Sequence, residues 1–388
     1  KDVDSRLFNI GIFLLASAPF ISCLFFLYPL FKGLLISKKY IIKDSIYKTF
    51  ILISILLILI SLKSTFFNNN EISTWTSSLN WAGIVNFIPL FICFIGFDSY
   101  LNDEIKRYTV SKYFIAGTIP VLISCIGQFW FKWYGPLEIL NGLIIWFQRP
   151  LTSINQNVTG LFSNPNYAAA WLTMMWPLSI TLLKEKLKIR EYLKSNIIFF
   201  IIIFLTSSSL LTNSRIPWVG FGIVIPFLFG KKSLKWYIPT LFFLILFLIS
   251  SDLTFIPTEI RDISQSLIPS HVQYKIREIT FNLDSFPRLG IWRSAIDFIL
   301  QKPLFGWGAN SFPYLYRLKT GFWNDHSHNL FLELSISYGL IISITFFTII
   351  SNILIKSFRS IFIIKKKSFF IDQGWWAAGL IFFVIHFF

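Results

Sequence analysis

Long apolar stretches constrain the fold of this sequence more than any other feature. Several of them approach the roughly 20 apolar residues that a helix needs to cross a bilayer. They cover residues 7–30, 49–62, 81–98, 113–130, 166–183, 196–212, 217–230, 236–250, 329–350 and 372–388. Charged residues make up only 14% of the chain, whereas a soluble domain carries about 25%. The sequence therefore predicts an all-α, polytopic transmembrane helical bundle of about ten spans, and it excludes a soluble enzyme and a disordered chain.

The basic residues distinguish the two sides of the membrane. Five segments between the apolar stretches hold 21 of the 35 Lys and Arg residues. They alternate with three short segments that hold one or two each and with the long segment 251–328, which holds eight. The positive-inside rule places the basic segments, which contain Lys38 and Lys232, in the cytoplasm, and it places Arg6 outside. The net charge of +16 then reflects membrane topology. We therefore expect the lipid bilayer and no nucleic acid as a partner.

The apolar stretches divide the chain into four predicted parts. These are N-terminal spans with an outer loop (1–165), further spans (166–250), a long outer loop (251–328) and C-terminal spans (329–388). The long loop has 78 residues and contains three of the four histidines. A loop of this length is usually functional, and we expect short helices in it, for example over 291–300. Because the chain starts at Lys1 and stops at Phe388 in an apolar run, we expect both ends to be trimmed.

The spans themselves are almost free of ionisable residues, which argues against a transporter with a charged pathway through the membrane. Polar groups gather instead on the predicted outer face. The first cluster is 160–166, where Asn166 is expected to cap the following helix. Beyond this structural role, the amides of Asn164 and Asn166 suit the hydroxyls of a sugar.

Two further clusters contain arginine. Arg215 lies in a tight turn between two spans, where its planar guanidinium matches phosphate oxygens; the alternative is a side chain that snorkels to lipid headgroups. The segment 288–312 contains Arg288 and Trp292, which share one face of a helix because they are four residues apart. The alternative there is an amphipathic surface helix that ends in a Pro-Gly turn.

The fourth cluster, 325–329, contains two histidines and precedes Glu333. Histidine is the side chain most often used as a general base near neutral pH. The alternative is that His326 and His328 face solvent and cap a helix, with Glu333 favourably placed near the positive end of that helix. A zinc site is weakly supported, because the cluster lacks a clear third ligand.

Four segments together resemble the O-antigen ligase and O-antigen polymerase superfamily of bacterial inner-membrane glycosyltransferases. They cover roughly residues 155–345, in the order of that family. The segments are GLFSNPNYAAAWL, TNSR, RLGIWRSAIDFILQKPLFGWGANSF and HSHNLFLELSISYGL.

This resemblance implies a multi-pass enzyme of the inner membrane with an active site on the periplasmic face. Such enzymes move a glycan from undecaprenyl pyrophosphate to an acceptor such as lipid A core or another glycan, without a metal or a cofactor. The resemblance assigns catalytic roles to His328, Arg215 and Arg288. It suggests substrate-binding roles for Arg293 (the alternative to Arg288), His326, Asn164, Asn166, Asn310 and Glu333.

Two other functions stay open at this point. A polysaccharide polymerase would use the same chemistry, and Arg149 and Gly160 have the Arg–Gly spacing of some polymerases, although one such pair is within what chance gives. The second alternative is a transporter of bicarbonate or another anion, for which the outer arginines and histidines would form the binding site.

Overall fold

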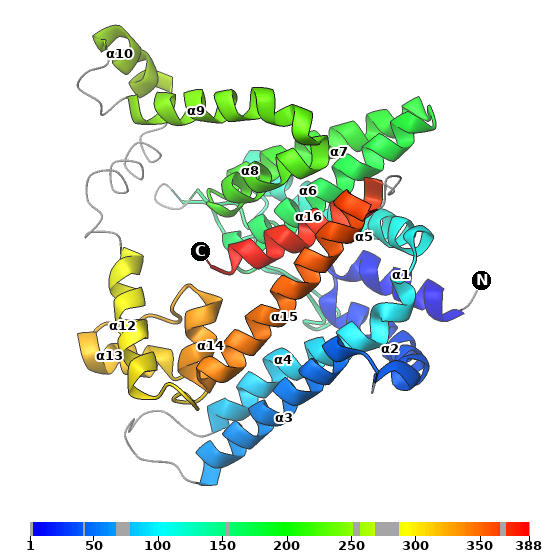
Figure 1. Ribbon diagram of the computed structural model, residues 1–388. Coiled ribbons are helices and arrows are strands. Elements are labelled where there is room, and N and C mark those ends of the chain that lie inside the picture. Colours follow the sequence, from blue (N-terminus) through cyan, green and yellow to red (C-terminus); the bar gives the residue numbers. More distant parts are fainter. Residues whose placement is uncertain are drawn as a thin grey trace. The chain divides into compact units, whose positions relative to one another are not determined.

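The computed structural model describes residues 3–41, 43–66, 78–152, 156–250, 257–267, 287–364 and 370–387 (Figure 1). These residues are mostly helical, and the strands among them form one antiparallel hairpin with Leu137 opposite Trp146. The all-α class predicted from the sequence is therefore confirmed. His271, one of the three histidines of the predicted outer loop, lies outside the described residues.

The elements of the described residues, in chain order, are α1 (Val3–Leu14), α2 (Pro19–Ile41), α3 (Ser45–Phe66), α4 (Ser78–Phe97), η1 (Asp98–Tyr100), α5 (Glu104–Trp130), β1 (Leu137–Ile139), β2 (Ile144–Trp146), α6 (Pro165–Lys188), α7 (Tyr192–Leu211), α8 (Ile216–Phe229), η2 (Lys231–Ser233), α9 (Leu234–Ser250), α10 (Thr258–Leu267), α12 (Pro287–Gln301), α13 (Phe312–Thr320), α14 (Leu330–Tyr338), α15 (Leu340–Phe358), η4 (Arg359–Ile364) and α16 (Phe370–Ile385).

Six helical stretches of the described residues are long and apolar enough to cross a membrane, which makes this a multi-pass membrane protein. They are Pro19–Ile41, Ser45–Lys63, Ser78–Tyr100, Glu104–Trp130, Tyr192–Leu211 and Leu340–Ile364. Two shorter apolar helices, Ile216–Phe229 and Phe370–Ile385, accompany them. The count of about ten spans is not confirmed, partly because two of the expected spans are broken.

The expected span 7–30 is divided between α1 and α2. Helix α2 begins at Pro19, because proline lacks the N–H that an interior helical position requires. The two helices then pack against each other, and the Ser22 hydroxyl donates to the Gly11 carbonyl at 2.7 Å. Asp4 at the start of α1 pairs with Lys32 in the second half of α2 at 2.9 Å. The start of α1 therefore lies beside the second half of α2.

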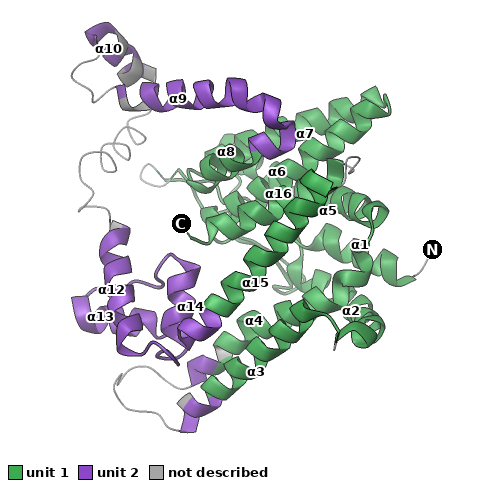
Figure 2. Ribbon diagram, in the orientation of Figure 1, with its two compact units in different colours: residues 1–61, 81–224, 344–388 green, residues 62–80, 225–343 purple. Residues whose placement is uncertain are grey.

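The chain divides into two compact units, shown in different colours in Figure 2. Unit 1 contains residues 1–61, 81–224 and 344–388. Inside it, α6 packs against α5, α7 and α16, and α1 packs against α2 and α5. Close approach depends on small residues, as it commonly does between membrane helices: a side chain at Gly33 would overlap the backbone of Gly96. A buried ion pair between Arg107 and Asp372, at 2.7 Å, joins α5 to α16.

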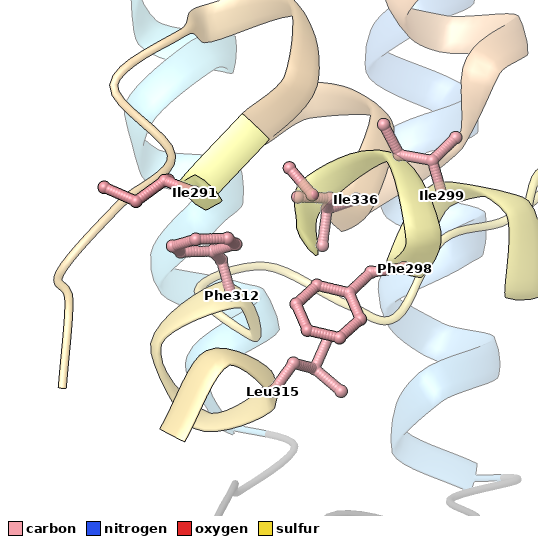
Figure 3. Packing of buried hydrophobic residues seen from close by; sticks show 7 residues of the cluster. Ile291, Phe298, Ile299, Phe312, Leu315 and Ile336 are labelled. Atoms are coloured by element: carbon pink, nitrogen blue, oxygen red, sulfur yellow. The ribbon is translucent and has the colours of Figure 1, made fainter. Parts of the chain in front are cut away.

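Unit 2 contains residues 62–80 and 225–343. Its core lies between α12, α13 and α14, where Phe298 and Phe312 meet edge to face with ring centroids 6.3 Å apart (Figure 3). The buried members of this cluster are Ile291, Ala295, Phe298, Ile299, Phe312, Leu315 and Ile336. The core fixes three short helices and the loops between them, and these loops contain several of the candidate site residues.

The expected span 329–350 is also broken. Gly339 separates α14 from α15 with φ 85° and ψ 168°, a conformation that is essentially restricted to glycine. The turn before α13 fills the break: the Trp307 N–H donates to the Ile336 carbonyl at 2.7 Å, and the Leu340 N–H donates to the Pro303 carbonyl at 2.8 Å. These bonds satisfy backbone groups that the interrupted helix leaves without partners.

Replacing Gly339 with alanine is expected to lower the free energy of unfolding by at least about 1–3 kcal/mol, the cost of a strained backbone conformation. A Cβ atom at this position would also overlap the backbone of Leu304. The thermal unfolding temperature of the purified protein in detergent measures the effect. Gly290→Ala is the matched control, because a Cβ atom in that helix meets nothing within 4 Å. Equal unfolding temperatures for the two variants would contradict the prediction.

Candidate active site

The loop 321–329, between α13 and α14, contains both histidines of the fourth sequence cluster and is held from two sides. The Trp292 indole N–H donates to the Ser327 carbonyl at 3.0 Å. The Ser327 N–H donates to a carboxylate oxygen of Glu333 at 2.8 Å. Because one bond comes from α12 and the other from α14, the backbone beside His328 is fixed to the core of unit 2.

His328 has an unusual backbone conformation and a partly enclosed side chain. Its φ is 55°, in the left-handed region that residues other than glycine adopt at some cost in free energy. Its ring is half-buried, and its centroid lies 4.4 Å from that of the His326 ring, which is exposed. Strained residues of this kind persist where the surrounding structure determines them, and they cluster at functional sites.

The surroundings of His328 favour its neutral form. Burial lowers the pKa of the imidazole to about 4, and electrostatic interactions with His326 and Arg288 act in the same direction, while Asp325 opposes them. At neutral pH the ring is therefore unprotonated and able to accept a proton. Burial raises the pKa of the Glu333 carboxyl, and the hydrogen bond from the Ser327 N–H opposes that rise.

The alternative that the two histidines cap a helix does not describe this loop. The cap of α14 is Asn329, whose side-chain oxygen accepts from the Leu332 N–H at 3.2 Å. The Glu333 carboxylate accepts a hydrogen bond from the backbone N–H of Ser327. Glu333 therefore holds the peptide chain that leads into His328.

Helix α12 carries both candidate arginines of the long loop. It spans Pro287–Gln301, slightly more than the expected 291–300. Arg288 is half-buried in the first turn of α12, and its positive charge contributes to lowering the pKa of His328. Arg293 is exposed. A positive side chain in the first turn is repelled by the positive end of the helix dipole. The two positive groups together favour the binding of an anion.

The turn 306–311 contains Asn310, which is exposed and has φ 55°. The turn is fixed by a residue that sequence reasoning missed. The side-chain oxygen of the fully buried Asn80, on α4, accepts from the Ala309 N–H at 2.8 Å. Asn80 is a polar residue directly before the apolar stretch 81–98, and this position could have indicated its role from the sequence.

In unit 1, Arg215 is exposed immediately before α8. The turn that presents it is built from short polar side chains. The Asn213 amide, at φ 51°, donates to the Asn157 side-chain oxygen at 3.0 Å. The Ser214 hydroxyl oxygen accepts from the Ile216 N–H at 3.3 Å. Arg215 therefore combines its own charge with the positive end of a helix, as Arg288 does on α12.

The first sequence cluster requires a correction. Asn164, not Asn166, caps α6, because its side-chain oxygen accepts from the Asn166 N–H at 2.8 Å. Pro165 takes the first helical position, where its missing N–H costs nothing, so the residue before it becomes the cap. Asn164 is half-buried and Asn166 is exposed. The cap role uses the side-chain oxygen of Asn164, and the Asn166 side chain is exposed.

The structure thus brings six of the predicted site residues into unit 2 and leaves three in unit 1. The residues of unit 2 are Arg288, Arg293, Asn310, His326, His328 and Glu333, and those of unit 1 are Asn164, Asn166 and Arg215. Within unit 2, one hydrogen-bonded framework joins α12, the loop 321–329 and α14.

Comparison with known families identifies one match. Residues 198–347 match the family model described as O-antigen ligase, and no curated protein matches the chain. The matched region contains the turn of Arg215, helix α12 and the loop 321–329, so it covers three of the four sequence motifs. This match supports the assignment of the chain to the O-antigen ligase superfamily, a group of membrane enzymes of the O-antigen ligase and polymerase type.

Proposed function

We propose that this protein is an inverting membrane glycosyltransferase of the O-antigen ligase kind. It moves a glycan from an undecaprenyl-pyrophosphate-linked donor to an acceptor hydroxyl at the periplasmic face of the inner membrane. Lipid A core, or another glycan, is the acceptor. The observation that carries the proposal is His328, a neutral imidazole held in a strained conformation within reach of the Arg288 charge.

His328 acts as the general base. The acceptor oxygen attacks the anomeric carbon of the donor sugar, and its proton passes to the imidazole directly or through one water molecule. The bond between the anomeric carbon and the pyrophosphate oxygen breaks, so undecaprenyl pyrophosphate leaves and the configuration at the anomeric carbon inverts. An imidazole whose pKa is lowered to about 4 is ready to accept this proton at neutral pH.

Arg288 binds the pyrophosphate, and the family resemblance implies a catalytic role for Arg215 as well. Negative charge builds on the leaving oxygen as the bond breaks, and fixed positive groups stabilise that charge without reorganisation. Each arginine lies at the beginning of a helix, where backbone N–H groups also favour an anion. A guanidinium matches phosphate oxygens through two parallel hydrogen bonds, which a lysine cannot form.

Deletion of the gene in its host tests this function. Surface glycolipids and polyprenyl-linked glycans are extracted from the deletion strain and from strains complemented with the wild type or with His328→Ala. We expect capped surface glycolipid to disappear and long polyprenyl-linked chains to accumulate, because assembly of the chain continues while its transfer stops. The wild-type gene should restore both profiles, and His328→Ala should restore neither.

Other outcomes separate the alternatives. Loss of long chains, with single repeat units left on the lipid carrier, would identify a polymerase that uses the same chemistry. Normal glycolipid and carrier profiles in the deletion strain would contradict the glycosyltransferase function. Uptake of bicarbonate would then be the activity to measure.

A further inference from the structure

The loop that contains the histidines also presents two large aromatic side chains to its surroundings. Phe322 is 76% exposed and Trp323 is 51% exposed. The loop begins at Gly321, which ends α13 with φ 79°. The exposed indole lies five residues before His328 in the same loop, and its open surface can contact a ligand.

Trp323 is held firmly despite its exposure. Its indole N–H donates to a carboxylate oxygen of Asp325 at 2.7 Å. Its ring meets the ring of Tyr314 edge to face, with centroids 5.3 Å apart. Tyr314 in turn packs against the buried cluster of unit 2. The indole is therefore fixed before any ligand arrives, and half of its surface remains open.

The same framework holds the indole and the histidines. The Asn324 amide donates to the His326 carbonyl at 2.9 Å, one residue after Trp323. Three residues further along the chain, Ser327 is fixed by α12 and α14. A ligand that rests on the indole thus binds to the segment that positions His328.

The chemistry of this surface matches a sugar ring. A pyranose has an apolar face of C–H bonds, which stacks on an aromatic ring, and hydroxyls at its rim, which hydrogen-bond to carboxylates and amides. Trp323 supplies the aromatic ring, and its polar N–H is already bonded to Asp325. Asp325 and Asn324 supply polar groups in the same loop.

We propose that Trp323 and Asp325 form a subsite that binds a sugar ring of the acceptor. This inference rests on the proposed function, because the acceptor is the substrate whose hydroxyl must reach His328. The donor pyrophosphate binds Arg288 on α12, and the loop 321–329 receives the acceptor. Trp323 therefore contributes to the affinity for the acceptor and to the choice of acceptor.

Initial rates of transfer by the purified full chain in lipid nanodiscs test the subsite. The acceptor probe is the uncapped glycolipid from the deletion strain, and the donor is the polyprenyl-linked glycan that accumulates there. Trp323→Ala should raise the acceptor KM by about tenfold, with the donor KM and kcat little changed. Trp323→Phe keeps a ring but loses the bond to Asp325, so a smaller rise is expected.

Phe322→Ala is the matched control, since it removes a neighbouring ring that is even more exposed. An acceptor KM unchanged by Trp323→Ala, or raised equally by Phe322→Ala, would overturn the subsite and leave both rings as part of a general apolar surface. A raised donor KM with an unchanged acceptor KM would overturn the assignment to the acceptor. If Trp323→Ala does not fold, Trp323→Phe and Asp325→Asn provide the same comparison.

Binding without turnover separates the subsite from the proposed function. Saturation-transfer NMR of the delipidated core oligosaccharide, with wild type and Trp323→Ala in nanodiscs, needs no donor. A signal that Trp323→Ala abolishes supports the subsite even if the wild type transfers no glycan, in which case the proposed function fails alone. Active wild type with an oligosaccharide signal that survives in Trp323→Ala would overturn the subsite alone.

Discussion

Replacing His328 with alanine is expected to lower the rate of glycan transfer by about 10²–10⁴-fold, which is what the loss of a positioned general base typically costs. The ring is only half-buried, and the backbone of its loop is held through Ser327. The variant should therefore fold, and its unfolding temperature should not fall. Initial rates of transfer with purified donor and acceptor measure the effect. A variant that retains wild-type transfer would contradict the role of His328.

His326→Ala is the control for this experiment. His326 is exposed and contacts the His328 ring, so its loss removes one of the positive groups that lower the pKa of His328. We expect a rate close to that of the wild type at neutral pH. Comparable losses in the two variants would show that the pair acts together and not through a single base.

The pH profile of kcat/KM gives a second measure of the same role. A base must be unprotonated to act, and the pKa of His328 is lowered to about 4. Wild-type activity should therefore persist as the pH falls through 6.5, the ordinary value for histidine, and should decline only as the pH approaches about 4. An acid limb near pH 6.5 that moves with His326→Ala would point to His326 as the base.

Replacing Arg288 with lysine is expected to lower kcat by about 10²–10³-fold, the usual cost of removing one donor that stabilises charge in the transition state. Lysine keeps the positive charge but loses the two-pronged geometry that fits phosphate oxygens. Because the charge remains, the acid limb of the pH profile should not move. Rates at saturating donor, together with that profile, separate the loss of geometry from a general change in electrostatics.

Arg293→Lys is the matched control on the same helix. Arg293 is exposed, whereas Arg288 is half-buried and its charge reaches His328. We expect Arg293→Lys to transfer glycan at nearly the wild-type rate. A large loss in Arg293→Lys with little change in Arg288→Lys would reverse the assignment, and the second arginine of the mechanism would be Arg293.

Much of the candidate site could be read from residue types and local spacing. A short helix was predicted over 291–300, and α12 extends from Pro287 to Gln301, so it also includes Arg288. The role of Trp292 in holding Ser327 was not predicted, since the two residues are 35 positions apart. Asn80 was missed for the same reason, because its partner Ala309 lies 229 positions away.

Hydropathy located the apolar segments, but it did not show where a segment is interrupted. Gly339 lies inside an apolar run, and only the packing of the turn around Leu304 explains why a helix ends there. Asn166 appeared to be a cap from residue type alone, whereas Pro165 moved that role to Asn164. In both cases a backbone requirement at one residue overrides the average character of its neighbours.

The sequence by itself determined that this chain is a helical membrane protein, because apolar runs can satisfy their backbone groups in lipid only as helices. It also indicated the superfamily, through motifs that each lie within a short segment, and the family match over residues 198–347 supports that resemblance. Only the tertiary structure decided the environment of His328. Its neutral state depends on burial and on the nearby charges of Arg288 and His326, and these quantities arise only when α12, α13 and α14 pack around one core.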